Sequence, residues 1–321
     1  MQKIREVTDN IIRESSKIII GKEEKLRLVM AAILCGGHVL LDDLPGVGKT
    51  TLVKTVSRVL GCAFSRVQFT PDLLPSDIVG MNIFNQKTGE FAVKSGPVMT
   101  NIFLADEINR AIPRTQAALL EAMEERQVTV DGVTYPLPSP FLVIATQNPV
   151  EMESTFHLPA AQIDRFMLRL SLGYPTHADE IDMLRTVGDE IPFDSLVPLL
   201  VSEEIADLQH QIRRVYLSES VLDYIVKLVA FTRKSELLML PAGPRGSRDL
   251  YRIGKVWAAV NGRDYVIPDD VKTLAPYVLC HRLALNSEAR LNGRSAGEVV
   301  EQALAEVEAP GSTEEALRAH R

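Results

Sequence analysis

The sequence predicts an α/β domain with a largely parallel sheet, followed by an all-helical domain. Up to about residue 172, short apolar segments alternate with amphipathic helical patterns, the order typical of a parallel sheet covered by helices. Polar residues collect directly after several predicted strands, and only helical patterns follow Tyr174-Pro175. In a chain of 321 residues we therefore expect two domains, 1–175 and 176–321.

The first domain is expected to hold five sheet strands. Two helical patterns, 1–20 and 22–36, come first, and Gly36-Gly37 is a typical helix stop. The sheet strands are expected at 38–41, 64–69, 101–105, 141–145 and 167–172, with further helices at 51–60 and 113–126. Two hairpins are expected at 82–93 and 127–135, the second turning at Asp131-Gly132. The second domain is expected to hold helices at about 177–188, 202–214, 218–234, 246–261, 268–280 and 296–307.

Composition and charge limit the class of partner. The net charge of -7 and the isoelectric point of about 5.5 argue against a broad basic surface for nucleic acid. The three cysteines (Cys35, Cys62 and Cys280) are isolated, which suits buried thiols in a reducing cytoplasm. No apolar stretch approaches the ~20 residues that span a bilayer, and the charged N-terminus does not resemble a signal peptide. We expect a cytoplasmic protein without membrane insertion.

A glycine-containing loop connects the first strand to a helix. Its pattern is that of a phosphate-binding loop, in which backbone N–H groups surround a phosphate, Lys49 meets the terminal phosphates and the Thr50 hydroxyl reaches Mg²⁺. The residues expected to bind nucleotide are Pro45, Gly46, Val47, Gly48, Lys49, Thr50 and Thr51. The first glycine of the usual G-x-x-x-x-G-K-[ST] pattern is Asp43 here. We expect this variation to be tolerated, because the glycines nearest the lysine remain.

Acidic and amide side chains follow two later strands. Asp106 can hold the hydration shell of Mg²⁺, and Glu107 can polarise the water that attacks the γ-phosphate. Asn148 can orient that water, or it can be a turn residue before Pro149. Because ligands of open α/β sheets bind beyond the carboxyl ends of the strands, these residues are candidates for one site.

Two arginines are candidates for charge stabilisation. Arg165 can reach the nucleotide of a neighbouring subunit, or it can form a surface ion pair with Asp164. Arg245 precedes a helix of the second domain, and it can reach the nucleotide or simply begin that helix.

Several long segments together carry a family resemblance. They are QFTPDLLPSD (68–77), LADEINR (104–110), QAALLEAMEE (116–125), ATQNP (145–149) and GRDYVIPDDV (262–271). In this order they resemble the MoxR family of AAA+ ATPases, and the match runs from about Gly21 to Pro310. A long ordered match of this kind is far more specific than the phosphate loop alone.

The resemblance implies a fold, a cofactor and an assembly. It implies an AAA+ αβα nucleotide-binding domain and a helical lid, joined into a ring that is usually a hexamer and that uses ATP, ADP and Mg²⁺. It makes Lys49 and Thr50 the phosphate and Mg²⁺ residues, Asp106 and Glu107 the metal and water residues, and Asn148 the first sensor. It makes Arg165 the arginine finger and Arg245 the second sensor, with Arg248 as the alternative. The resemblance also implies that the two hairpins are the insertions typical of this clade, facing the ring surface or pore.

The resemblance also leaves departures and functional alternatives. The family commonly has a glutamate where this chain has Ala160, and PAGPR (241–245) stands in place of a small-Ser-Pro-Arg pattern. The implied function is a chaperone-like remodeller that hydrolyses ATP and matures client proteins, often with von Willebrand factor A-type (VWA) domains. The alternatives are a DNA-associated motor or loader, disfavoured by the acidic balance, and a scaffold that binds ATP without hydrolysis, disfavoured by Glu107 and Asn148.

Overall fold

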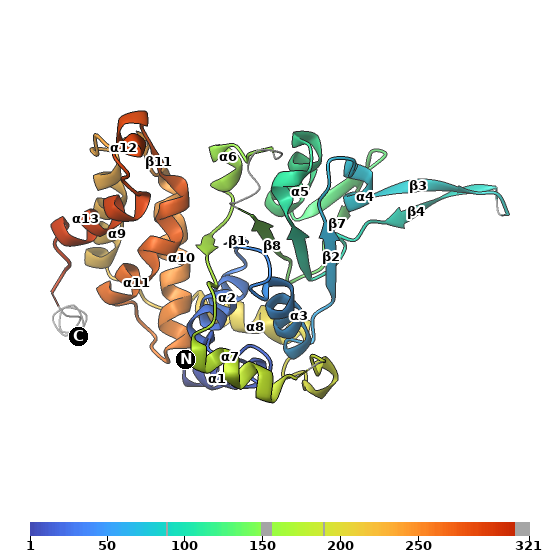
Figure 1. Cartoon of the computed structure of the whole chain (residues 1–321), viewed down its shortest axis with the longest axis horizontal. Helices are drawn as coiled ribbons and strands as arrows, with labels where there is room; N and C mark the ends of the chain where they lie inside the picture. Colours follow the sequence, from blue (N-terminus) through green and yellow to red (C-terminus); the bar gives the residue numbers. More distant parts are fainter. Residues whose placement is uncertain (88, 149–155, 189, 312–321) are drawn as a thin grey trace. The chain divides into compact units, whose positions relative to one another are not determined.

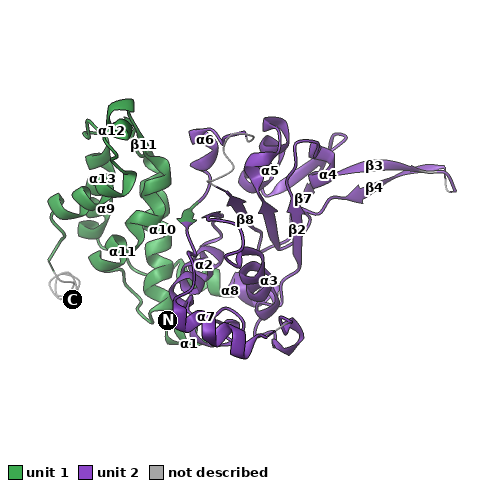
Figure 2. Cartoon of the chain, in the orientation of Figure 1, with its two compact units in different colours: residues 1–8, 167–169, 208–321 green, residues 9–166, 170–207 purple. Residues whose placement is uncertain are grey.

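The computed structural model describes residues 1–87, 89–148, 156–188 and 190–311, so Thr88 and Pro149 of the predicted segments lie outside it. The chain forms two compact units (Figure 2). Unit 1 holds residues 1–8, 167–169 and 208–321, and unit 2 holds residues 9–166 and 170–207. Each unit is described by itself below.

Four strands in the order β2-β5-β8-β1 form the centre of unit 2 (Figure 1), and β9, whose residues are divided between the two units, completes the five-strand order β2-β5-β8-β1-β9. The strands are β1 (Val39–Asp42), β2 (Phe64–Gln68), β5 (Ile102–Asp106), β8 (Leu142–Gln147) and β9 (Leu168–Leu170). β2 pairs with β5, β5 with β8 and β8 with β1, all in parallel. The predicted α/β fold with a parallel sheet is therefore confirmed.

The central strands are apolar because both of their faces are covered. Every residue of β5 is buried, and so are the first five residues of β8. In register, Gln68 lies beside Asp106, and Leu41 lies beside Thr146. The carboxyl ends of β2, β5, β8 and β1 therefore meet at one edge of the sheet, where the predicted polar residues follow them.

Helices of unit 2 complete the core. They are α2 (Glu23–Cys35), α3 (Lys49–Val59), α4 (Pro75–Val79), α5 (Pro113–Glu125), α6 (Ala160–Ile163) and α7 (His177–Thr186), with short 3₁₀ turns at Ile108–Arg110 and Phe193–Ser195. α1 (Gln2–Ser15) and α8 (Ser202–Ile212) each have one end in either unit. The apolar side of α5, with Leu119 and Met123, belongs to the same core as Phe103 and Val143 of the sheet. This burial of apolar surface fixes the strand ends that carry the site.

Two antiparallel hairpins interrupt the alternation, as the sequence predicts. The first joins β3 (Gly80–Asn85) to β4 (Glu90–Ser95) and projects from the sheet of unit 2 (Figure 1). The second joins β6 (Gln127–Val130) to β7 (Val133–Pro136). The side-chain amide of Asn82, in β3, donates to the carboxylate of Asp131 (2.7 Å), so strand β3 of the first hairpin contacts the turn of the second.

The segment after the sheet groups with unit 2, not with the later helices. Lys22 Nζ donates to the carbonyl oxygen of Leu172 (2.7 Å), and the N–H of Leu199 donates to the carbonyl of Val59 (2.7 Å). The start of α2 and the end of α3 therefore hold this segment, and residues 170–207 group with unit 2.

Helices dominate unit 1. They are α9 (Glu219–Thr232), α10 (Pro244–Val260), α11 (Pro268–Leu279), α12 (Ser287–Leu291) and α13 (Ala296–Glu306), with a 3₁₀ turn at Cys280–Arg282. α10 packs on α9 and α11, and α13 packs on α9 and α11. The expected helical C-terminal region is confirmed, with one addition: β10 (Leu238–Leu240) and β11 (Ala284–Leu285) form a small antiparallel sheet.

Two further expectations concern composition. Of the three cysteines only Cys62 is buried, and burial raises the pKa of its thiol to about 11. Cys35 and Cys280 are partly buried. In the part of the chain that the structure describes, we find no helix with the length and apolar character needed to span a membrane.

Candidate nucleotide-binding site

The phosphate loop occupies the turn between β1 and α3. Gly46 and Gly48 have φ angles of 84° and 86°, the left-handed region that glycine adopts without strain. Gly48 caps α3, which begins at Lys49. The first N–H groups of any α-helix have no acceptor within the helix, so Lys49, Thr50 and Thr51 direct donors and the positive end of the helix dipole toward an anion.

A cavity of about 370 Å³ opens beside this loop. Its lining residues come from the loop, α3 and the ends of three strands: Pro45, Gly46, Gly48, Lys49, Thr50, Thr51, Arg66, Gln68, Asp106, Glu107 and Asn148. Of the predicted site residues, the structure thus brings together the loop and the three strand-end residues. Val47 lies in the loop but does not line the cavity.

Asp106 and Glu107 are held through one threonine at the end of β8. The hydroxyl of Thr146 donates to Asp106 Oδ1 (2.6 Å) and accepts the backbone N–H of Glu107 (2.8 Å). Thr146 is fully buried, and Glu107 has a left-handed backbone with φ of 54°. A non-glycine residue in that conformation needs support from its surroundings, and the Thr146 contact supplies some of it.

Three polar side chains that the sequence did not single out surround the two carboxylates. Arg66 donates to Asp106 Oδ2 from Nε (3.1 Å) and from Nη2 (2.7 Å). Gln68 Nε2 and Arg110 Nη1 both donate to Glu107 Oε2, at 2.7 and 2.9 Å. Alternation along β2 places Arg66 and Gln68 on one face, but only the register with β5 shows which face meets Asp106.

The residues present fit a nucleotide with Mg²⁺. The cavity offers a lysine and a helix N-terminus for phosphates, and the Thr50 hydroxyl and the Asp106 carboxylate as hard oxygen ligands. Among the described residues no group of three or more His, Cys, Asp or Glu side chains could hold a metal. Mg²⁺ usually binds through one or two protein oxygens together with substrate phosphates, which matches this sparse set.

Asp43, in place of the first glycine of the loop, is a structural anchor. It is 5% exposed, and its carboxylate accepts hydrogen bonds from the Ser171 hydroxyl and from the backbone N–H groups of Leu172 and Gly173. Its backbone carbonyl accepts from Lys49 Nζ (2.7 Å). The residue therefore joins the loop to the segment that follows β9.

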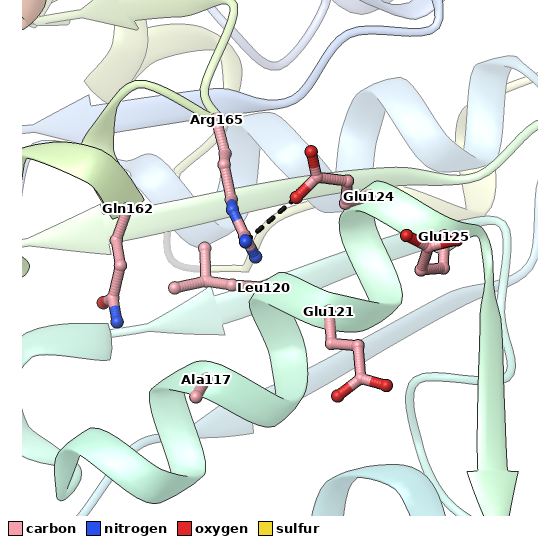
Figure 3. A pocket seen from close by; sticks show the side chains of 7 residues that line it. All are labelled: Ala117, Leu120, Glu121, Glu124, Glu125, Gln162 and Arg165. Carbon is pink, nitrogen blue, oxygen red and sulfur yellow. Dashed lines mark ion pairs between the residues drawn. The ribbon is translucent and has the colours of Figure 1, made fainter.

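Arg165 lies elsewhere in unit 2. It lines a second pocket of about 300 Å³ together with residues of α5 and α6. Its guanidinium and the Glu124 carboxylate point toward one another at 2.9 Å (Figure 3). Arg165 is not among the residues that line the phosphate-loop cavity. Ala160, where the family commonly has a glutamate, is exposed at the start of α6.

Arg245 and Arg248 belong to unit 1, in the first turns of α10. Arg248 Nε lies 3.8 Å from Oδ1 of Asp249, a carboxylate that pairs with buried Arg282 at 2.6 Å. Burial raises the pKa of Asp249, and the arginines around it oppose that effect. The start of α10 is thus fixed by a buried ion pair, with both candidate arginines next to it.

A parallel sheet whose strand ends join a glycine loop, a lysine-threonine helix start and an acidic pair defines a P-loop nucleotide-binding protein. Residues 38–168 match the model of the ATPase family associated with various cellular activities (AAA), and residues 230–303 match the AAA lid domain.

Relatives that align over most of the chain identify the family within this class. The chain is 46% identical to the uncharacterized protein YeaC of Bacillus subtilis, over 93% of both chains. It is 41% identical to chaperone MoxR1 of Mycobacterium tuberculosis, over 94% of this chain and 82% of the relative. A crystal structure from Cytophaga hutchinsonii, of a protein assigned as an ATPase, matches with a TM-score of 0.90 and 39% identity over 96% of both chains. The chain belongs to the MoxR family of AAA+ ATPases.

Proposed function

We propose that this chain hydrolyses ATP to ADP and phosphate at the phosphate-loop cavity. One observation carries the proposal: Lys49, Thr50, Asp106, Glu107 and Asn148 line a single cavity, although they come from three separate segments of the chain. Phosphoryl transfer depends mainly on positioning and charge stabilisation, and these side chains supply both.

Each residue has a proposed role that follows from its chemistry. Lys49 leaves the Asp43 carbonyl to meet the terminal phosphates, while the N–H groups of the loop surround them. Thr50 and Asp106 hold Mg²⁺, which when bound neutralises charge on the β- and γ-phosphates. Glu107 accepts the proton of the attacking water, and Asn148 orients that water.

We further propose that hydrolysis drives remodelling of client proteins by a ring of subunits. The name of the relative from Mycobacterium tuberculosis, chaperone MoxR1, supports a chaperone-like activity. The family resemblance supports a hexamer in the cytoplasm and clients with VWA domains. In such a ring Arg165 of one subunit acts on the nucleotide of its neighbour, and Arg245, or Arg248 in its place, acts as the second sensor from the helical lid expected at 176–321.

Two variants test the hydrolytic site. Lys49→Ala should lose binding of a fluorescent ATP analogue, because the phosphate charge loses its partner. Glu107→Gln should bind that analogue with wild-type affinity and lose phosphate release by a factor of about 100 or more, the size expected for removal of a general base. Glu180→Gln, at an exposed site on α7, is the control and should match the wild type. Wild-type turnover in Glu107→Gln would contradict the role of Glu107.

The same Glu107→Gln chain tests the client proposal. Held in the ATP state, it should retain proteins that the wild type releases. Mass spectrometry of material that co-purifies with Glu107→Gln in ATP, and not with Lys49→Ala, identifies the clients. Identical sets from both variants would contradict an ATP-dependent interaction.

A further inference from the structure

Arg66 contacts Asp106, the carboxylate that we propose holds the metal. It stands in β2, beside Leu104 in the register with β5, and its guanidinium reaches Asp106 Oδ2 through two nitrogens, at 2.7 and 3.1 Å. The Arg66 side chain is 46% exposed and lines the phosphate-loop cavity, whereas that of Asp106 is 12% exposed. The arginine can therefore swing into solvent, while the carboxylate stays in place.

Both oxygens of the Asp106 carboxylate have donors in this structure. Thr146 donates to Oδ1, from a fully buried position, and Arg66 donates to Oδ2. Thr146 is fixed by its second hydrogen bond to the Glu107 backbone. Of the two partners, Arg66 is the one that can be displaced without opening the core.

The charges that line the cavity also balance. Lys49 and Arg66 are positive, and Asp106 and Glu107 are negative. Since an unpaired carboxylate that is largely out of water is costly, a cation beside Asp106 stabilises the site when no metal is bound. Arg66 supplies that cation.

We propose that Arg66 is the counter-ion of Asp106 in the metal-free site and that Mg²⁺ must displace its guanidinium to approach the carboxylate. This inference rests on the proposed function, in which Asp106 is a metal residue. As a consequence, Arg66 weakens Mg²⁺ binding. The metal then binds together with nucleotide phosphates, because their contacts with Mg²⁺ compensate for the loss of the Arg66–Asp106 ion pair.

Displacement of Arg66 should also affect Glu107, because Gln68 contacts both residues. Arg66 Nη2 donates to Gln68 Oε1 (3.1 Å), and Gln68 Nε2 donates to Glu107 Oε2 (2.7 Å). When Arg66 leaves Asp106, Gln68 loses the partner that orients its amide. Arg66 is thus a positioning residue that couples metal arrival at Asp106 to the orientation of Glu107.

The experiment measures how strongly Mg²⁺ improves nucleotide affinity. Fluorescent ADP is titrated into the full chain in excess EDTA and in excess MgCl₂, and the ratio of the two dissociation constants gives the coupling. In Arg66→Gln the ratio should rise about tenfold over the wild type, the factor expected for loss of one half-exposed charge-assisted pair. Arg66→Lys, which keeps the charge but not the two-nitrogen contact, should give a smaller rise.

Arg58→Gln is the matched control, because Arg58 forms a single exposed ion pair with Asp194 in the same unit. Its ratio should equal that of the wild type. If the ratio of the two dissociation constants is unchanged in both Arg66 variants, the proposal is overturned. If Arg66→Gln does not fold, the ratio measured in Arg66→Lys decides the question by itself.

A further variant separates this inference from the proposed function. Asp106→Asn should lose the effect of Mg²⁺ on ADP affinity. A wild-type chain indifferent to Mg²⁺, or an effect that survives in Asp106→Asn, would overturn the metal role of Asp106 and the Arg66 inference with it. Loss of the effect in Asp106→Asn with no change in the Arg66 variants overturns the Arg66 inference alone.

Discussion

The carboxylate of Asp43 accepts the backbone N–H of Leu172, with 2.6 Å between the nitrogen and Oδ2. It also accepts the Ser171 hydroxyl at 2.6 Å and the N–H of Gly173 at 3.1 Å. The position that holds the first glycine in the usual phosphate-loop pattern is therefore a buried anchor in this chain. The structure gives Asp43 no left-handed backbone, in contrast to Gly46 and Gly48, so nothing in the turn requires glycine there.

Restoring the usual glycine should accordingly damage the protein. Asp43→Gly leaves the N–H groups of Leu172 and Gly173 without their acceptor, and we expect the free energy of unfolding to fall by about 3 kcal/mol. Urea unfolding followed by circular dichroism measures it. Asp182→Asn, at an exposed site on α7, should change stability by less than about 0.5 kcal/mol. A stability equal to the wild type in Asp43→Gly would show that the anchor is dispensable.

The strand ends and loops of the site could be predicted because their signals are local. Short apolar runs predict most of the strands, and the residues that follow them, Lys49, Asp106, Glu107 and Asn148, are visible in sequence order. Parallel strands bring their carboxyl ends to the same edge, so the shared cavity follows from the fold class. The short turn residues 131–132 likewise identify a hairpin.

The contacts that support these residues could not be predicted, because their partners are distant in sequence. Arg66 and Asp106 are separated by 40 positions, as are Asp106 and Thr146. Pairing them requires the strand order β2-β5-β8, which no local pattern encodes. The strand pair β10–β11 was missed because its members are three and two residues long.

Thr146 should matter for turnover through its two hydrogen bonds. Thr146→Val keeps the side-chain shape but leaves Asp106 Oδ1 and the Glu107 N–H without this hydroxyl. We expect about a tenfold loss of phosphate release and a loss of stability of about 1–2 kcal/mol, since a partly buried N–H is left unpaired. ADP affinity measured in EDTA should not change.

Thr146→Ser is the corresponding rescue variant, because serine retains the hydroxyl. It should recover most of the turnover. Equal turnover in the valine and serine variants would assign the effect to packing and not to the hydroxyl.

A partly buried ion pair of unit 1, between Arg263 and Asp270, should contribute to the stability of the helical region. Arg263 donates to both oxygens of Asp270, at 2.7 and 2.5 Å, and Asp270 also accepts the N–H of Ile267 at the start of α11. Asp270 raises the pKa of the Arg263 guanidinium, so Arg263 stays charged throughout the ordinary pH range. Asp270→Asn should lower the free energy of unfolding by about 3 kcal/mol, because the charge of Arg263 loses its partner. Asp223→Asn, which breaks an exposed pair with Lys227, is the control and should cost about 0.5 kcal/mol or less.

Arg165 should act only across a subunit boundary. Its guanidinium pairs with Glu124, and Arg165 does not line the phosphate-loop cavity of the same chain. Arg165→Ala should therefore keep ADP affinity. Its phosphate release should fall by a factor of about 1000, the effect expected when an arginine finger is lost. Arg114→Ala, at an exposed arginine on α5, should behave as the wild type.

Mixing Arg165→Ala with Glu107→Gln chains should restore part of the activity, because some interfaces then combine an intact Glu107 with an intact Arg165. Mixing Arg165→Ala with chains that carry both changes should restore none, since no interface then has an Arg165. Full activity of Arg165→Ala alone, or equal activity of the two mixtures, would dismiss Arg165 as the finger and direct the search to the other exposed arginines of unit 2.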